Sequence, residues 1–284
     1  MNASEITEQL SGHLTVLDLL FPAGVAVLVI WLIKTSLGRK ALWDSPGRPN
    51  NLPVYMPFAP LFIWFFFVAA AMTVTARYLS QLAEWKQVFM NNLFLLGGAV
   101  IAGAVAAKLG RRYFLDGLRG LGIKAGGIPK DLLSALLSLL AVWPVVALAI
   151  ALTIKVGQAI FGSEFQIQQH QELMVLTEYH QTILTVLVVI VTVIAAPVFE
   201  EMLFRGLLQS TILSHTSRPW LTIFITSAIF AFVHPNPQHW PGLFVLGVGL
   251  GYSYEKSGSL FRPIFMHSTF NAVVVATIIL YGRS

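Results

Sequence analysis

The chain contains 284 residues, of which 56% are hydrophobic and only 11% are charged, and its formal net charge is +5. A water-soluble domain carries about 25% charged residues, so this composition excludes an ordinary globular enzyme and a disordered chain. In so apolar a chain the excess of Lys and Arg is expected in cytoplasmic loops, and no nucleic acid is predicted as a partner. The chain has no cysteine, so it has no disulfide, thiolate ligand or cysteine nucleophile.

Long apolar runs recur along the chain and predict membrane-spanning helices. A helix needs about 20 mostly apolar residues to cross the hydrocarbon core of a bilayer. The residues before the first run include Glu5 and Glu8 but no Lys or Arg, unlike the positively charged start of a signal peptide. We therefore expect the first run to remain as a span, and the predicted class is an all-α polytopic membrane protein with about eight transmembrane helices. The predicted spans are residues 14–33, 57–76, 88–107, 131–154, 181–203, 220–233, 240–254 and 264–281.

The sixth and seventh predicted spans, 220–233 and 240–254, are short for a bilayer. They either extend past these boundaries or are broken or re-entrant helices. Irregular backbone at membrane depth is tolerated where it lines a cavity, so a broken helix here would suit a functional site.

The distribution of basic residues predicts the orientation. Fourteen of the 18 Lys and Arg residues fall on one side of the predicted spans, most of them in the loops 34–56 and 108–130. Because cytoplasmic loops are enriched in Lys and Arg, both termini are predicted outside. The acidic loop 155–180 then lies outside and is expected to hold a polar, interfacial helix. The predicted location is a bacterial-type cell membrane.

Two regions of the chain differ in whether their apolar spans contain polar residues of catalytic type. Residues 1–180 are predicted to form about four transmembrane helices, with a basic cytoplasmic loop and an external polar loop. Residues 181–284 are predicted to form the remaining helices and contain polar residues of catalytic type within apolar spans.

Three charged residues interrupt the fifth predicted span. Glu200, Glu201 and Arg205 lie in an otherwise apolar stretch, where ionisable groups are costly and usually functional. Glu201 and Arg205 are four residues apart on one helical face and are predicted to pair. Glu200 is rotated by about 100° from Glu201, so we expect it to face a polar cavity as a candidate base. Pro197 is expected to kink the helix nearby. The alternative is an ion-pair network that only fixes packing.

Two later spans add histidines. His234 follows an apolar run, and Phe230 lies four residues before it, so the ring can pack beside the imidazole. His267 and Asn271 are also four residues apart and share a face. Each histidine alone is better explained as a satisfied core residue. Polar residues of catalytic type in three late spans are poorly explained as separate accidents, so the combination favours a site.

These residues form three motifs that resemble a known family. EEMLFR at 200–205 resembles EExxxR, FAFVH at 230–234 resembles FxxxH, and HSTFN at 267–271 resembles HxxxN. Together and in this order they resemble the CPBP family, named for CAAX proteases and bacteriocin-processing enzymes, which includes the type II CAAX prenyl proteases. The resemblance covers about the last 100 residues, and the first 180 residues show no family motif.

The resemblance implies an eight-helix intramembrane endopeptidase of the glutamate type. On this reading Glu200 and His234 activate the attacking water, and His267 with Asn271 holds the oxyanion. Such a mechanism is chemically reasonable, because a carboxylate can take the water proton while polar donors stabilise the tetrahedral intermediate.

The resemblance also implies the surroundings of the site. Glu201, Arg205 and Phe230 would support the catalytic residues, with no cofactor and no metal. The implied partners are a membrane-associated protein or peptide substrate and the lipid bilayer, and the site is expected to open toward the cytoplasm. The family resemblance does not specify prenylation of the substrate.

Two alternatives remain open from the sequence. Two histidines and a glutamate could bind zinc with a free fourth position, although no HExxH motif is present. A non-catalytic scaffold or immunity protein, or a transporter, would also use paired charges within the membrane. No inverted repeat is visible in the sequence, which disfavours the transporter.

Overall fold

The structure is a computed structural model that describes residues 16–124, 126–167 and 171–281. Regular elements in this part of the chain are helical, apart from an isolated bridge between Asn50 and Phe114. The elements are α2 (Val16–Lys34), α3 (Phe58–Val74), η1 (Thr75–Leu79), α4 (Glu84–Tyr113), α5 (Ile128–Phe161), α6 (Gln171–Glu178), α7 (Thr182–Val189), η2 (Ile190–Ala195), α8 (Ala196–Glu201), η3 (Met202–Gln209), α9 (Ser210–Thr216), α10 (Pro219–Phe232), η4 (Pro237–His239), α11 (Trp240–Ser257) and α12 (Phe261–Tyr281).

Within the described residues, each of the eight predicted spans coincides with a helix or a continuous helical run, and the all-α polytopic class is confirmed. Residues 14 and 15 of the first predicted span lie outside the described residues. In the described part of the chain, five helices are long and apolar enough to cross a membrane. Two shorter apolar helices, Leu20–Lys34 and Pro219–Phe232, accompany them. The five long helices are Phe58–Leu79, Glu84–Tyr113, Ile128–Phe161, Thr182–Thr216 and Phe261–Leu280.

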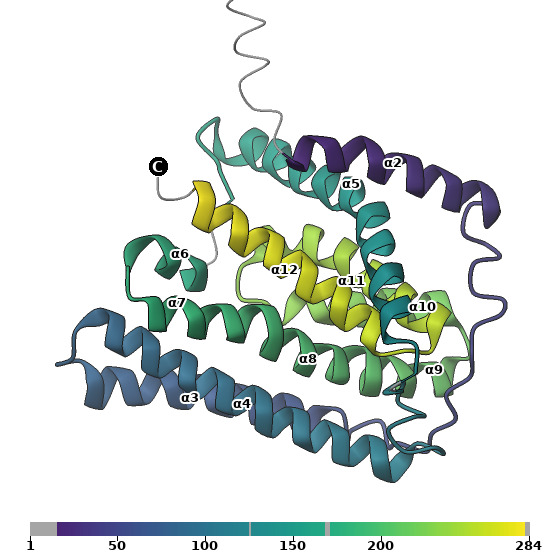
Figure 1. Cartoon of the computed structure of the whole chain (residues 1–284), viewed down its shortest axis with the longest axis horizontal. Coiled ribbons are helices and arrows are strands. Elements are labelled where there is room, and N and C mark those ends of the chain that lie inside the picture. The colour runs from purple at the N-terminus through teal and green to yellow at the C-terminus, as the bar shows by residue number, and fades with distance from the viewer. Residues whose placement is uncertain (1–15, 125, 168–170, 282–284) are drawn as a thin grey trace, which may run out of the picture.

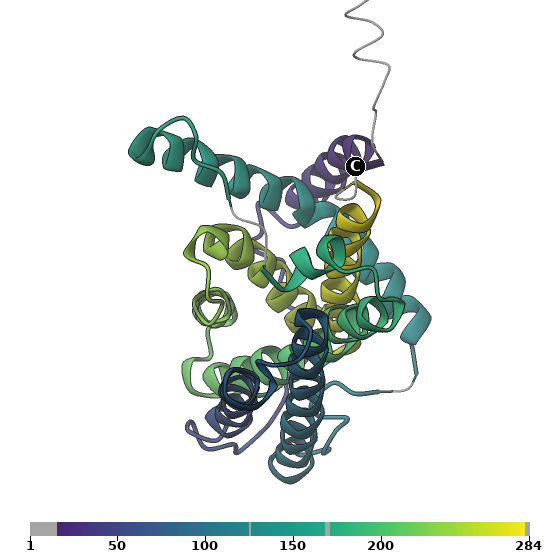
Figure 2. The ribbon, with the colours of Figure 1, turned by 90° about the vertical axis from the view of Figure 1, so that its left-hand side faces the viewer.

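The run from α7 to α9 lies in the middle of the bundle. In Figure 1, α3 and α4 form one edge, α7 to α9 lie beside them, α11 and α12 follow, and α5 and α2 form the opposite edge. The central run contacts α4 on one side and α10, α11 and α12 on the other. Figure 2 shows the end of α5 projecting away from the other helices, and Phe161 there is 74% exposed.

Loops with most of the basic residues meet at one end of the bundle. The N–H of Asn51 donates to the carbonyl of Tyr113 at 3.1 Å, and the N–H of Leu260 donates to the carbonyl of Gly122 at 3.0 Å. These bonds join the loops that follow α2, α4 and α11. The grouping is the one that the charge distribution predicts, and the cytoplasmic assignment of this end stays a prediction.

The central run is one helix that widens at two π-helical segments, η2 and η3. Pro197 lies just after η2 and has no N–H to donate to a preceding carbonyl. The N–H of Ala196 donates to the carbonyl of Val191, five residues back, as in a π-helix. The helical donors that would normally reach the carbonyl of Thr192 are therefore missing.

Candidate active site

Glu201 is the centre of the site. Its side chain is fully buried in the middle of the central run. Its Oε1 accepts from Nη1 of Arg205 at 2.9 Å and lies 2.8 Å from Nδ1 of His267. The four-residue spacing aligns Glu201 with Arg205, and the packing of α12 against α8 brings His267 to Glu201. A buried carboxylate is thus paired with a guanidinium and an imidazole.

Arg205 is held by three different groups. Beside its ion pair with Glu201, its Nη2 donates to the carbonyl of Gly247 on α11 at 3.3 Å. Its guanidinium carbon lies 4.5 Å from the ring centroid of Phe230. A cation above an aromatic face is attracted by the ring quadrupole, so Phe230 stabilises the buried charge as well as filling space.

His267 is directed by Glu201 and faces Glu200. We assign the hydrogen to Nδ1, because that nitrogen lies against the Glu201 carboxylate. The other nitrogen, Nε2, is 3.9 Å from Oε2 of Glu200. This separation is too long for a direct hydrogen bond, and it is suitable for a water molecule that bonds to both atoms.

Glu200 lies off the buried ion pair, as the helical geometry predicts. Its side chain is 18% exposed, whereas that of Glu201 is fully buried. Two adjacent carboxylates therefore have different environments: one is neutralised inside the bundle, and the other is accessible beside an imidazole.

His234 joins this group through Phe230. It follows the end of α10, and its Nδ1 is 2.7 Å from the carbonyl of Phe230. The ring of Phe230 packs against both imidazoles, with centroids 4.9 Å from His234 and 5.7 Å from His267. Trp240 Nε1 donates to the carbonyl of His234 at 2.9 Å, which ties the start of α11 to this turn. Phe230 is thus the hydrophobic spacer between the two histidines.

Asn271 has a partner that the sequence does not reveal. Its Nδ2 donates to the carbonyl of Thr192 at 2.9 Å. That carbonyl is the one left without its helical donor by Pro197 and the π-helical turn. Asn271 therefore ties α12 to η2, and in this structure one of its two amide hydrogens is already used.

An apolar pocket of about 420 Å³ borders the two helices that carry Glu201 and His267. It lies between the central run and α12, with Val198 and Met202 on one side and Ile264 and Ser268 on the other. Ser268 directly follows His267 in the chain, but none of the predicted catalytic residues is among the residues that line the pocket.

Three buried polar residues outside the candidate site were not predicted from the sequence. Gln209 continues the four-residue spacing of Glu201 and Arg205 and is fully buried. Glu255 and Arg48 form a second buried ion pair. Gln209 could have been found from its spacing, and Glu255 from its position near the end of an apolar span. Nothing in the sequence pairs Arg48 with Glu255.

The described residues contain no group of three or more His, Cys, Asp or Glu side chains arranged to hold a metal ion.

The helical bundle and its buried Glu–Arg–His cluster define an integral membrane protein with a polar site between its C-terminal helices. Residues 182–273 match the family model described as type II CAAX prenyl endopeptidase Rce1-like. This match contains all three motifs and confirms the resemblance over that region.

A curated relative of this chain is also named as a membrane peptidase. The chain is 29% identical over 89 residues to a Bacillus subtilis (strain 168) protein named "Putative membrane peptidase YdiL". The alignment covers 31% of this chain and 36% of the relative, so the chain spans about a third of the length of the relative it matches. A comparison with solved structures found no significant match.

Proposed function

We propose that the protein is an intramembrane endopeptidase that hydrolyses peptide bonds with a water activated by Glu200. The observation that carries the proposal is the different environment of the two adjacent carboxylates. Glu201 is neutralised by Arg205 and His267, while Glu200 is accessible and faces Nε2 of His267 at 3.9 Å. The family match of this region supports a membrane protease.

In the proposed mechanism Glu200 takes a proton from the attacking water, and His234 helps to place that water. The hydroxide attacks the scissile carbonyl, and the oxyanion forms near Nε2 of His267, where a protonated ring would donate to it. Asn271 contributes its remaining amide hydrogen or, through Thr192, the position of the helix. The proton held by Glu200 then passes to the amide nitrogen, the C–N bond breaks, and the tetrahedral intermediate collapses to a carboxylic acid and a free amine.

The substrate we propose is a membrane-associated protein or peptide. The pocket between the central run and α12 is lined almost entirely by apolar side chains, so it would accept an apolar part of a substrate that reaches the site from the bilayer. The cytoplasmic opening of the site and the bacterial-type cell membrane are part of the same proposal.

The decisive experiment compares Glu200→Gln with the wild type on a library of membrane-tethered reporter peptides. Glutamine is nearly isosteric but cannot act as a base, so we expect cleavage to be abolished while the melting curve is unchanged. Glu178→Gln is the matched control, because Glu178 is exposed on α6, and it should cleave normally. Near-normal turnover by Glu200→Gln would overturn the glutamate mechanism.

A chelator series tests the zinc alternative on the same substrate. We expect o-phenanthroline and EDTA to leave the cleavage rate unchanged and the active protein to contain no stoichiometric zinc. Loss of activity that added zinc restores would favour the metalloprotease instead.

A further inference from the structure

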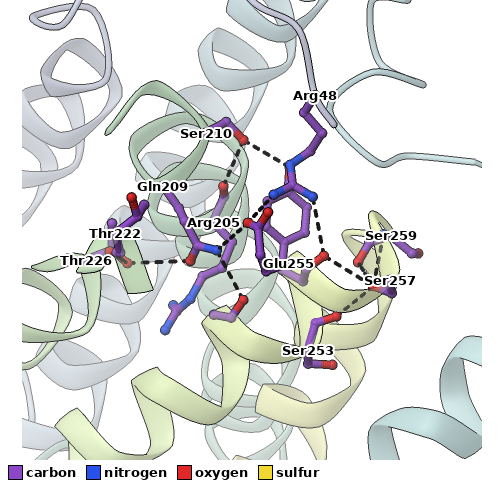
Figure 3. Close-up of polar contacts among 12 residues, drawn as sticks. Arg48, Arg205, Gln209, Ser210, Thr222, Thr226, Ser253, Glu255, Ser257 and Ser259 are labelled. Atoms are coloured by element: carbon purple, nitrogen blue, oxygen red, sulfur yellow. Dashed lines mark hydrogen bonds and ion pairs between the residues drawn. The ribbon is translucent and has the colours of Figure 1, made fainter. Parts of the chain in front are cut away.

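A series of buried polar contacts, called the ladder below, joins Arg205 and Gln209 of the central run to α11 and to Arg48 at the end of the bundle where the basic loops meet. Figure 3 shows the part of it from Gln209 to Arg48. Its first rung is the bond from Arg205 to the carbonyl of Gly247. Its second is the bond from Nε2 of Gln209 to the carbonyl of Gly251 at 3.1 Å. Both partners advance by four residues, so successive turns of the central run are joined to successive turns of α11.

The last contact of the ladder is the ion pair between Arg48 and Glu255, which lie far apart in the chain. Oε2 of Glu255 accepts from Nε2 of Gln209 at 3.2 Å and pairs with Nη2 of Arg48. The side chains of Arg48 and Glu255 are only 3% and 2% exposed. Arg48 comes from the loop between α2 and α3, and its guanidinium lies 4.1 Å from the ring centroid of Tyr254. The N-terminal region thus supplies the counter-charge for a carboxylate of α11.

The amide of Gln209 contacts two neighbouring helices, α10 and α11. The hydroxyl of Thr226 on α10 donates to its Oε1 at 3.5 Å. A Cβ atom at Gly251 would lie 2.8 Å from the same Oε1, so the glycine leaves the space that the amide occupies. These contacts tie the side chain of Gln209 on the central run to both α10 and α11.

We propose that Glu255, held by Arg48, is a positioning residue that acts through Gln209. It fixes the rotation of the helix on which Glu200 and Glu201 lie, two turns away. A buried ion pair contributes little net stability compared with apolar residues of similar size, which favours a role in positioning. The inference about helix rotation stands on the contacts alone, and its effect on turnover rests on the proposed protease function.

Two charge-neutral double variants separate positioning from charge pairing. Both contain Arg48→Met, combined with Glu255→Gln in one and with Glu255→Leu in the other. Only the glutamine keeps an acceptor for Gln209. We expect the glutamine variant to keep the parent kcat, and the leucine variant to lose about 10- to 100-fold in kcat at unchanged KM, because misplaced catalytic groups reduce the chemical step. Equal kcat values for the two variants would overturn the proposal.

A second readout does not depend on protease activity. The chain has no cysteine, so Glu200→Cys can be introduced alone and into each double variant and labelled with a water-soluble thiol reagent. We expect the labelling rate to match the parent in the glutamine background and to differ in the leucine background. Equal rates in both would overturn the positioning role. If the parent cleaves no substrate, the proposed function fails, and the labelling rates still decide the positioning role.

Gln209→Met provides a further variant if the leucine variant does not fold. Methionine keeps the volume and leaves the ion pair intact, but it removes the hydrogen bonds from residue 209 to the Gly251 carbonyl and to Glu255. We expect the same changed labelling of Glu200→Cys in this background. A labelling rate equal to that of the parent would contradict the proposal.

Discussion

Glu201 shows how one carboxylate can be accommodated inside a membrane bundle. Its Oε1 is shared by the guanidinium of Arg205 and the imidazole of His267, and all three side chains are buried. Transfer of a lone carboxylate into such surroundings is very costly, so its partners are part of the fold as much as of the site.

Glu201→Gln and Arg205→Met are each expected to lower the free energy of unfolding by about 3–5 kcal/mol, because each leaves a buried charge without its partner. The double variant should lose less than the sum, with a coupling energy of about 0.5–3 kcal/mol. Chemical denaturation in mild detergent measures all four proteins. Additive losses would show that the two side chains do not interact.

At the residue scale, the sequence predicts contacts within one helix and misses those between helices. The spacing of Glu201 and Arg205 is enough to predict their pair, and the 100° rotation per residue is enough to separate Glu200 from it. The contact between Glu201 and His267 joins residues 66 positions apart and depends on how two helices pack. No periodicity in either segment contains that information.

At the scale of elements, Pro197 removes a backbone donor from the central run, and a side chain of α12 replaces it. The proline and the π-helical turn leave the carbonyl of Thr192 without a helical donor, and Asn271 donates to it. The hydrophobic pattern of the run cannot predict this, because hydropathy is the same in an α-helical and a π-helical register.

Asn271→Ala is expected to destabilise the protein by about 1–2 kcal/mol, because it leaves the Thr192 carbonyl unsatisfied. Adding Pro197→Ala supplies a backbone N–H within the same helix, which can bond to a carbonyl of η2. We expect this second change to restore most of the lost stability in thermal unfolding. A double variant as unstable as Asn271→Ala would show that the amide does not serve this carbonyl.

The crossing of α2 and α5 depends on a single glycine. A Cβ atom at Gly24 would lie 2.2 Å from the carbonyl oxygen of Leu140, which is backbone and cannot rotate away. Gly24→Ala should therefore cost about 1–3 kcal/mol as α2 is pushed outward. Gly103→Ala on α4 is the control, since its Cβ meets nothing within 4 Å, and it should be neutral or stabilising by up to about 1 kcal/mol. Similar thermal unfolding of the two variants would exclude the close approach.

Helix boundaries were predicted well where the apolar run ends abruptly and poorly where it does not. The predicted span 220–233 differs from α10 by one residue at each end. The predicted span 88–107 lies inside α4, which continues to Tyr113 through Arg111 and Arg112. A helix continues beyond the apolar core when its polar ends reach the aqueous interface, so hydropathy underestimates its length.

At the scale of the whole molecule, the orientation can be tested on the natural cysteine-free background. Arg112→Cys lies at the basic end of the bundle, and Ser163→Cys lies in the acidic loop after α5; both positions are exposed. We expect an impermeant maleimide to label Ser163→Cys on intact cells and Arg112→Cys only after the membrane is opened. The reverse pattern would invert the assignment.

The family match and the structure delimit the C-terminal unit differently. The matched region, 182–273, contains Glu255 but not Arg48, which lies in the loop after α2. The structure therefore joins the matched region to the N-terminal part of the chain through a buried ion pair, and sequence comparison of the motif region alone does not detect this contact.

The distance along the chain between Arg48 and Glu255 has a consequence for biosynthesis. The two residues are 207 positions apart, so at about 5–20 residues per second a ribosome adds the carboxylate roughly 10–40 s after the guanidinium. During this interval Arg48 can stay hydrated at the membrane surface, and α11 then enters a bundle where its counter-charge is already present. In the opposite order, a carboxylate would have to wait within the bilayer for its partner. A nascent chain that lacks the first loop would deliver Glu255 without that partner, and membrane quality control would meet an uncompensated charge.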